Sequence, residues 1–346
     1  KFIELPSASK DSELVRITSA VKPDVVLTTV DLVGKLPLDV QRRALLVDTM
    51  PLGEAEAALR LALPIEFCPA VGAEGHATAE KADAEGGAFC VLTSGTTSTA
   101  KIVVCPHAAL TTASYFADDL VEGDAVGLFW LWYNMCSALA LGATVVVLPD
   151  SAFIHPEALL AAVESHKLAG LFVTPSILGA CLATSGNAIA KQLASLKVLW
   201  TTGERLPTDT RARLRKLLPN LRVRSVYSTN ESGDVAIDDG AMSSLALLPE
   251  IHAEVLDADG GATPLCAVGR LHVRSPSLFK GYWTAEGIRY EPGEGELYRT
   301  GDLVRWEGGA RITFCAREAA SHIKVRGFKV FPELVEAEIN KHPAVA

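Results

Sequence analysis

The chain lacks the cysteine and histidine spacings that bind transition metals. Its 346 residues contain no Cys-x-x-Cys pair and no His-Glu-x-x-His motif, and the eight histidines do not cluster. These absences argue against a structural or catalytic zinc site. The seven cysteines are scattered, odd in number and mostly set in apolar surroundings, which predicts buried free thiols and a cytoplasmic, reducing environment.

Long apolar runs and long basic runs are also missing. No apolar stretch reaches the roughly 18 residues that a membrane-spanning helix needs, and the first residues show no signal-peptide pattern. The formal net charge is −9, and the densest basic cluster, residues 211–217, is interleaved with leucines as in an amphipathic helix. We therefore expect neither a membrane nor a nucleic-acid partner.

What the chain does contain is enough apolar sequence for a large core. It is 49% hydrophobic and 21% charged, and up to about residue 250 it alternates apolar runs with helical segments. Beyond 251, short segments alternate with period two. Strands are expected at 24–29, 44–48, 143–148, 170–173, 198–202 and 223–227, and helices at 54–63, 106–120, 208–218 and from residues 155 and 332 onward.

This pattern predicts an α/β fold. Residues 1–250 are expected to form a domain of mixed or parallel sheets flanked by helices. Residues 251–317 are expected to add a smaller antiparallel, barrel-like unit to that domain, and 318–346 to begin a small α+β subdomain.

One polar loop is the main candidate for chemistry. Seven consecutive small or hydroxyl residues, Thr93 to Thr99, are followed after one alanine by Lys101. This composition suits a phosphate ligand: the hydroxyl groups can donate hydrogen bonds, Gly95 lets the backbone come close, and the ammonium of Lys101 balances negative charge. An ordinary polar loop would explain the same residues equally well. The kinase-type phosphate loop is disfavoured, because its second glycine and the hydroxyl after the lysine are absent.

Two predicted strands end in polar residues that belong at one edge of the sheet. The segments are TTGE at 201–204 and YSTNE at 227–231. Open α/β sheets bind ligands at the carboxyl ends of their strands, so these segments mark a second candidate binding region.

Six ordered sequence blocks together resemble the adenylate-forming superfamily of acyl-CoA synthetases, luciferases and adenylation domains of nonribosomal peptide synthetases. TSGTTSTAK resembles the family's TSGTTGxPK, and YRTGD matches without change. The other blocks are WTTGE at 200–204, VYSTNE at 226–231, GYW at 281–283 and the segment from 316 to 336.

The resemblance implies that the protein activates a carboxylic acid with ATP to an acyl-adenylate, releases pyrophosphate, and passes the acyl group to a phosphopantetheine carrier protein or to coenzyme A. It implies Lys101, Thr96 and Glu231 as catalytic residues, with Glu231 holding Mg²⁺. The β- and γ-phosphates would be bound by Thr93, Ser94, Gly95, Thr96, Thr97 and Lys101. The rest of ATP, or AMP, would be bound by Gly203 and Glu204 beside the adenine, Tyr227 stacked on it, Asn230 near the α-phosphate, Asp302 on the ribose and Arg317 near ribose and phosphate.

Several positions depart from the family pattern. Ser98 replaces glycine and Ala100 replaces proline in the loop; Ser228 replaces glycine and Asn230 replaces threonine in the tyrosine block. Ala319 stands at the hinge position, and Phe129 stands where amino-acid-activating members carry an aspartate. Phe129 argues against an ordinary α-amino acid substrate.

The sequence also stops before the family's late lysine and begins after the family's first elements. Two other functions therefore stay open. A nucleotide-binding or scaffold module with weakened or lost catalysis fits the substitutions, and a kinase-like enzyme or another ATP-dependent ligase fits the phosphate loop alone.

Overall fold

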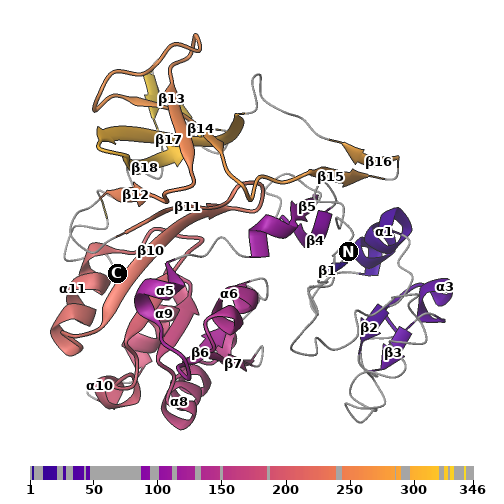
Figure 1. Ribbon diagram of the computed structural model, residues 1–346, viewed down its shortest axis with the longest axis vertical. Coiled ribbons are helices and arrows are strands. Elements are labelled where there is room, and N and C mark those ends of the chain that lie inside the picture. The colour runs from indigo at the N-terminus through magenta and orange to yellow at the C-terminus, as the bar shows by residue number, and fades with distance from the viewer. Residues whose placement is uncertain are drawn as a thin grey trace, which may run out of the picture. The chain divides into compact units, whose positions relative to one another are not determined.

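The computed structural model describes residues 2–3, 11–21, 26–28, 34–42, 44–46, 87–93, 101–110, 115–128, 134–148, 151–184, 188–238, 244–284, 286–289, 297–318, 323–325, 328–330 and 339. The chain forms two compact units (Figure 1). Unit 1 contains Lys1–His107 and Phe279–Glu291, and unit 2 contains Ala108–Leu278 and Pro292–Ala346.

Unit 1 is built on a five-stranded sheet in the order β1-β4-β5-β15-β16. Its strands are β1 (Phe2–Ile3), β4 (Gly87–Leu92), β5 (Ile102–Pro106), β15 (Gly281–Thr284) and β16 (Gly287–Arg289). Every residue of β5 is buried, and Ile17 of helix α1 (Asp11–Val21) packs in the same apolar cluster as Ile102 and Val104. A parallel pair, β2 (Val26–Thr28) and β3 (Ala44–Leu46), and helix α3 (Leu38–Gln41) complete its described elements.

Unit 2 contains an eleven-stranded sheet whose first half is parallel. The parallel order is β7-β6-β8-β9-β10. These strands are β6 (Ala125–Leu128), β7 (Thr144–Val147), β8 (Gly170–Val173), β9 (Val198–Thr201) and β10 (Arg222–Thr229). The crossover helices are α6 (Asn134–Ala140), α7 (Ser151–Ile154), α8 (Pro156–His166), α9 (Pro175–Thr184), α10 (Ile189–Gln192) and α11 (Thr208–Leu217).

The two faces of this parallel half pack against different apolar clusters. Leu171 and Leu199 belong to the cluster under α8, α9 and α10, whereas Phe172 and Trp200 belong to the cluster with α5 (Phe116–Asp119). Successive side chains of a strand point to opposite faces, so this alternation places helices on both sides of the sheet. Trp200 is fully buried, and its Nε1 donates to Asp119 Oδ2 over 3.1 Å.

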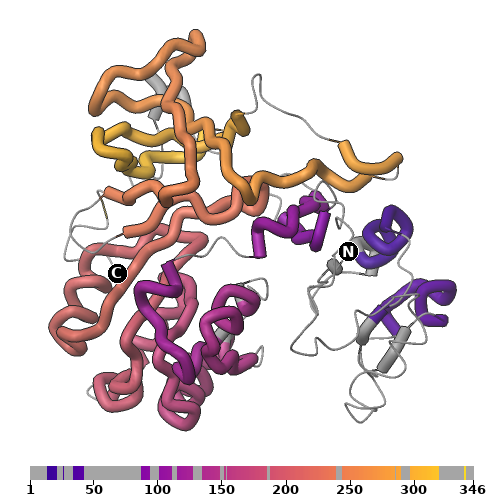
Figure 2. Tube along the Cα trace, viewed as in Figure 1, coloured from indigo at the N-terminus to yellow at the C-terminus, as the bar shows by residue number. Residues whose placement is uncertain are grey.

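The second half of the same sheet is antiparallel and continues from β10 in the order β11-β12-β18-β17-β14-β13 (Figure 1). Figure 2 shows the later part of this half, beyond residue 250, as an orange-to-yellow tube. Its strands are β11 (Gly233–Ile237), β12 (Leu245–Leu247), β13 (His252–Leu256), β14 (Val268–Arg274), β17 (Tyr298–Gly308) and β18 (Arg311–Arg317). Leu271, Val304 and Ile312 are fully buried at its centre. Strand β10 therefore joins the parallel and the antiparallel halves.

Beyond β18, the described part of the chain contains a short antiparallel pair, β19 (Ile323–Val325) and β20 (Phe328–Val330). Of the helix expected from residue 332, only the helical conformation of residue 339 is described. The helix expected at 54–63 lies outside the described residues. The predicted domain boundaries after residues 250 and 317 stay predictions.

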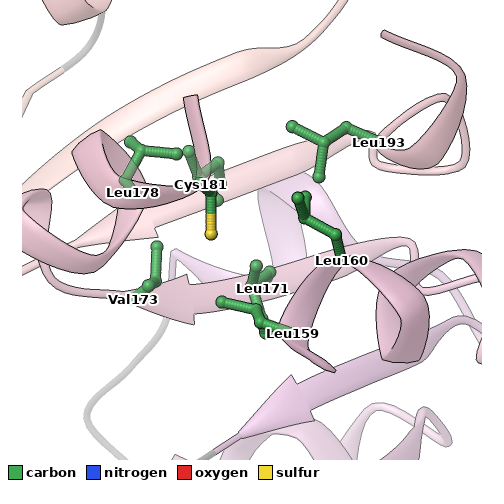
Figure 3. Close-up of a pocket in the computed structure, with 8 residues that line it drawn as sticks. Leu159, Leu160, Leu171, Val173, Leu178, Cys181 and Leu193 are labelled. Atoms are coloured by element: carbon green, nitrogen blue, oxygen red, sulfur yellow. The ribbon is translucent and has the colours of Figure 1, made fainter. Parts of the chain in front are cut away.

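A small cavity lies under β8 and β9, inside the cluster of α8, α9 and α10 (Figure 3). Its volume is about 10 Å³, and the Sγ of Cys181 points into it. The lining is entirely apolar: Leu159, Leu160, Leu171, Val173, Leu178, Cys181, Leu193 and Leu199. Since this space is about one water molecule in size and offers no polar partner, it is a packing gap rather than a ligand site.

Two expectations from the sequence were wrong. The helix expected at 106–120 does not begin at Pro106, because β5 continues through that residue and pairs it with Gly87. The described residues after it form a 3-10 turn, η1 (His107–Leu110), and the short helix α5. Cys136 and Cys266 are exposed, although the cysteines were expected to be buried; Cys90, Cys105 and Cys181 are buried.

Candidate active site

The carboxyl ends of β8, β9 and β10 meet at one edge of the parallel half of the sheet. The register aligns Val173 with Thr201 and Thr201 with Ser225, so the residues that follow these strands lie together. Glu204 after β9 accepts hydrogen bonds from Ser176, the second residue of α9 after β8. The Ser176 backbone N–H donates over 3.2 Å, and its hydroxyl donates to the same Oε2. The edge predicted from the sequence is therefore a real cluster of polar groups.

Gly203 shapes the turn between β9 and Glu204. Its φ is +83°, in the left-handed region that side chains with a Cβ rarely adopt, and no heavy atom lies within 4 Å of the position that a Cβ would take. The turn therefore needs glycine for its backbone conformation and leaves open space beside it, which suits the close approach of a ligand.

Paired hydroxyl groups connect β9 to β10 beside this turn. Thr201 Oγ1 lies 3.1 Å from Ser225 Oγ, and Thr202 Oγ1 lies 3.0 Å from Ser228 Oγ. Ser228 is one of the departures from the family pattern, and its hydroxyl here bonds the neighbouring strand. The substitution is thus accommodated by a specific contact in this chain.

Tyr227, Asp302 and Arg317 form a contact between the two halves of the sheet. The Tyr227 hydroxyl donates to Asp302 Oδ2 over 2.5 Å, and Arg317 Nε lies 3.5 Å from Asp302 Oδ1. Asp302 is buried and faces Arg317 across the β17–β18 register. Burial, followed by the Asp302 charge and the hydrogen bond to it, raises the pKa of Tyr227 well above its usual value, so the phenol stays a neutral donor.

The connection between β10 and β11 is a fixed turn that carries Asn230 and Glu231. Thr229 Oγ1 accepts the Ser232 backbone N–H over 3.0 Å and lies 2.7 Å from the Ser232 hydroxyl. Gly233 closes the turn with a φ of +69°, and a Cβ there would lie 2.7 Å from the Ser277 Cβ. Only glycine fits this position without displacing the backbone.

Glu231 supplies one carboxylate at this edge. Mg²⁺ takes oxygen ligands and is usually held by one or two carboxylates together with substrate phosphates, so this donor fits the ion that the resemblance implies. Within the described residues, no group of three or more histidine, cysteine, aspartate or glutamate side chains is arranged to hold a metal ion.

Lys101 and Thr93 belong to unit 1, whereas the other described candidates belong to unit 2. The Lys101 backbone N–H donates to Thr93 Oγ1 over 3.0 Å, and the Thr93 N–H donates to the Lys101 carbonyl over 3.0 Å. The Lys101 ammonium lies 4.4 Å from the centre of the Tyr282 ring in β15. Outside the described residues lie the remaining loop candidates Ser94, Gly95, Thr96 and Thr97, as well as Ser98, Ala100, Phe129 and Ala319.

Sequence reasoning missed two contacts near the strand-end cluster. Ser176 follows β8 and contacts Glu204; the same strand-end rule, applied to β8, could have found it. Tyr115 donates its hydroxyl to Asp234 Oδ2 over 2.9 Å, between the residue before α5 and the second residue of β11. Burial raises the pKa of Asp234 to about 6, the Tyr115 hydrogen bond opposes this, and the charge of Glu250 adds to it.

The comparisons with known proteins identify the class as that of the adenylate-forming enzymes. The AMP-binding enzyme family model matches residues 4–283. The chain therefore belongs to the AMP-binding enzyme family. No helix among the described residues is long and apolar enough to cross a membrane.

Two curated relatives and one solved structure illustrate the likeness. Glycine betaine reductase ATRR from Emericella nidulans is 31% identical over 306 residues, which cover 80% of this chain and 24% of that protein. L-proline--[L-prolyl-carrier protein] ligase from Streptomyces coelicolor is 28% identical over 281 residues, which cover 75% of this chain and 52% of that protein. The chain thus spans about a quarter of the first relative and about half of the second.

The solved structure is the ATP-bound RpMatB-BxBclM chimera B3. It superimposes with a TM-score of 0.79 at 20% identity, covering 99% of this chain and 69% of the other. This likeness confirms the predicted α/β fold class.

Proposed function

We propose that this chain is the nucleotide- and acid-binding part of an enzyme that activates a carboxylic acid as its acyl-adenylate. The carboxylate of the substrate attacks the α-phosphorus of ATP, the bond to the bridging oxygen of pyrophosphate breaks, and pyrophosphate leaves. The acyl group then passes to the thiol of a phosphopantetheine carrier protein or of coenzyme A, and AMP leaves.

The observation that carries this proposal is the contact of Tyr227, Asp302 and Arg317 at the strand-end edge. A buried carboxylate oriented by a phenol and an arginine suits the hydroxyl groups of a ribose. The Tyr227 ring beside it offers a flat apolar face for adenine, and Gly203 leaves room next to Glu204.

The chemistry in this proposal is mainly electrostatic. In-line displacement at phosphorus spreads negative charge over phosphoryl oxygens, and fixed donors and cations lower the barrier by stabilising that charge. Lys101, with Thr93, Ser94, Gly95, Thr96 and Thr97, would bind the β- and γ-phosphates, and Asn230 would donate to the α-phosphate. Mg²⁺ held by Glu231 would supply further positive charge.

The direct test is ATP–pyrophosphate exchange with the full-length protein and a panel of carboxylic acids. The names of the two relatives place glycine betaine and L-proline in the panel, together with aliphatic and aromatic acids. Exchange that depends on one acid and is lost in Lys101→Met and Glu231→Gln variants supports the proposal. Absence of exchange with every acid, despite ATP binding measured by calorimetry, would refute it.

The second candidate, a nucleotide-binding module without catalysis, is favoured by the substitutions at Ser98, Ala100, Asn230 and Ala319. A non-hydrolysable acyl-adenylate mimic separates the two functions. An active adenylation site binds the mimic much more tightly than ATP, because the mimic also fills the acid subsite. A module that binds nucleotide alone shows no such gain.

A further inference from the structure

The chain immediately after β18 is held by a carboxylate between two arginines. The Glu318 Oε1 accepts from Arg270 Nε over 2.7 Å, and its Oε2 accepts from Arg299 Nε over 3.2 Å and from a terminal nitrogen of the same guanidinium. Arg270 lies on β14 and Arg299 on β17, so Glu318 connects the end of β18 to both strands. This arrangement, the Glu318 clamp, consists of Glu318, Arg270 and Arg299.

The clamp is formed by ionised groups that are partly shielded from water. The side chains of Glu318 and Arg270 are 25% and 28% exposed. Burial raises the pKa of Glu318, but hydrogen bonds and charge from Arg299 and Arg270 outweigh it, so the pKa lies below its usual value. Glu318 is therefore ionised at neutral pH, and both arginines are engaged.

Beside the clamp, the Glu318 backbone is also bonded next to the proposed nucleotide site. The Glu318 backbone N–H donates to the carbonyl of Gly301 over 2.7 Å. Gly301 precedes Asp302, and Glu318 follows Arg317, so this bond lies directly beside the Asp302–Arg317 pair. The Asp302 backbone N–H is held in turn by Thr300 Oγ1 over 3.1 Å.

The Asp302–Arg317 pair needs such support. Arg317 is 56% exposed, and its Nε lies 3.5 Å from Asp302 Oδ1, which is long for a charged hydrogen bond. Asp302 is buried, but a contact this long to a half-exposed arginine orders the guanidinium only weakly. The position of the Arg317 guanidinium therefore depends in part on where its backbone is held.

We infer that Glu318 is a positioning residue for nucleotide binding: its clamp on Arg270 and Arg299 keeps Arg317 and Asp302 in register for the ribose and phosphate. The inference rests on the proposed nucleotide site. Glu318 does not contact the nucleotide itself and acts through Arg317.

The test measures ATP binding by calorimetry with Mg²⁺ in the full chain, together with thermal unfolding. Glu318→Ala is expected to weaken ATP binding about tenfold, because a phosphate then binds without one well-placed cationic partner. Glu318→Gln should weaken it less, since the amide keeps an acceptor for one guanidinium. In exchange assays the KM for ATP rises more than kcat falls, because the reacting groups stay in place.

The chain offers a matched control in Glu307. Its Oε1 accepts from Arg305 Nε over 2.8 Å and from Thr313 Oγ1 over 2.7 Å, so it makes a comparable cluster on β17 and β18. Glu307→Ala is expected to lower the unfolding temperature in the same way as Glu318→Ala, but to leave the Kd for ATP within about twofold.

A double-mutant cycle decides whether Glu318 acts through Arg317. In an Arg317→Met background, Glu318→Ala is expected to cause no further loss of ATP affinity. An equal loss in that background, or an ATP Kd unchanged by Glu318→Ala, overturns the inference. If Glu318→Ala does not fold, ATP affinity is compared in the same way for Glu318→Gln and Arg299→Gln, since each of these variants removes part of the clamp.

Failure of the proposed reaction looks different. If no acid supports exchange while ATP still binds, the proposed acyl-adenylate formation is refuted. The dependence of ATP binding on Glu318 can still be measured in that case. A wild-type chain that does not bind ATP overturns both proposals.

Discussion

The Tyr227 hydroxyl bonds the Asp302 carboxylate over 2.5 Å, although the two residues are 75 positions apart in the sequence. Tyr227 lies on β10, the strand that joins the two halves of the sheet, and Asp302 lies in the antiparallel half. The two family motifs that contain them are therefore parts of one contact, and this bond gives the first prediction.

Replacement of Tyr227 by phenylalanine should destabilise the fold and weaken ATP binding. The variant keeps the ring but removes a donor from a buried carboxylate, which costs about 1.5–3 kcal/mol for a hydrogen bond to a charged group. Urea unfolding measures the loss, and calorimetry measures ATP affinity. Asp302→Asn is the companion variant, because its amide oxygen can still accept from Tyr227; equal stability of Tyr227→Phe and wild type would contradict the prediction.

The Asp234 carboxylate should make folding stability depend on pH. Its pKa rises from 3.8 to about 6 in the folded chain, mainly through burial. The ionised form is therefore less favourable in the folded state: the stabilising contribution is complete below pH 4 and is lost as the pH rises through 6. Asp234→Asn removes this dependence, so the variant should gain stability relative to wild type between pH 4 and 7.

Chemical unfolding at several pH values checks this prediction. Asp259→Asn, in an exposed turn, is the control for the substitution itself. Tyr115→Phe should extend the dependence to higher pH, because it removes the hydrogen bond that favours the ionised carboxylate and so raises the pKa of Asp234 further. A difference between Asp234→Asn and wild type that is constant over this pH range is the contrary result.

Tyr282 should influence ATP binding through Lys101. The Lys101 ammonium lies 4.4 Å from the Tyr282 ring centre, and the Tyr282 ring packs edge-on against buried Phe279 with centroids 4.9 Å apart. A cation–π contact at an exposed site is worth about 0.5–1 kcal/mol, so Tyr282→Leu should weaken ATP binding roughly two- to fivefold. Tyr282→Phe keeps the aromatic face and should bind nearly as wild type.

A Lys101→Met background tests the origin of that effect. If Tyr282 acts by orienting the ammonium, Tyr282→Leu should have no further effect on ATP affinity once the ammonium is gone. A loss of the same size in both backgrounds would show that the tyrosine only supports β15.

The cysteines should divide into two classes in their reaction with iodoacetamide. Cys136 and Cys266 are exposed, whereas Cys90, Cys105 and Cys181 are buried, and burial raises the pKa of Cys181 to about 11. Since the thiolate is the reactive form, alkylation of the native chain followed by mass spectrometry should label the exposed pair first. Early labelling of Cys181 would mean that the cluster around the cavity opens readily.

Much of the parallel half could be predicted from the sequence, because strands buried on both faces appear as short apolar runs. The strand expected at 170–173 is β8, and those expected at 198–202 and 223–227 differ from β9 and β10 by one or two residues at their ends. The residues after these strands were also expected at one edge, and the structure places Glu204 and Ser228 there.

Contacts that depend on strand order could not be predicted. The bond from Tyr227 to Asp302 requires β12 and β18 to lie between β11 and β17, and no local pattern specifies that order. The helix expected from Pro106 failed for a related reason: proline suits a first helical turn, but here it ends a buried strand that pairs with Gly87. The pairing of β5 with β4 therefore outweighed the local preference of the sequence for a helix start at Pro106.

The position of β18 in the sheet has a consequence for folding during translation. On the ribosome, β10, β11 and β12 emerge well before β17 and β18. Strand β18 pairs with the edge of β12 that faces away from β11. Until β18 arrives, β12 has an open edge, and no strand joins it to β17, which carries Asp302. We therefore expect a nascent chain to gain the complete contact of Tyr227, Asp302 and Arg317 in one late step of translation, after Arg317 has left the exit tunnel.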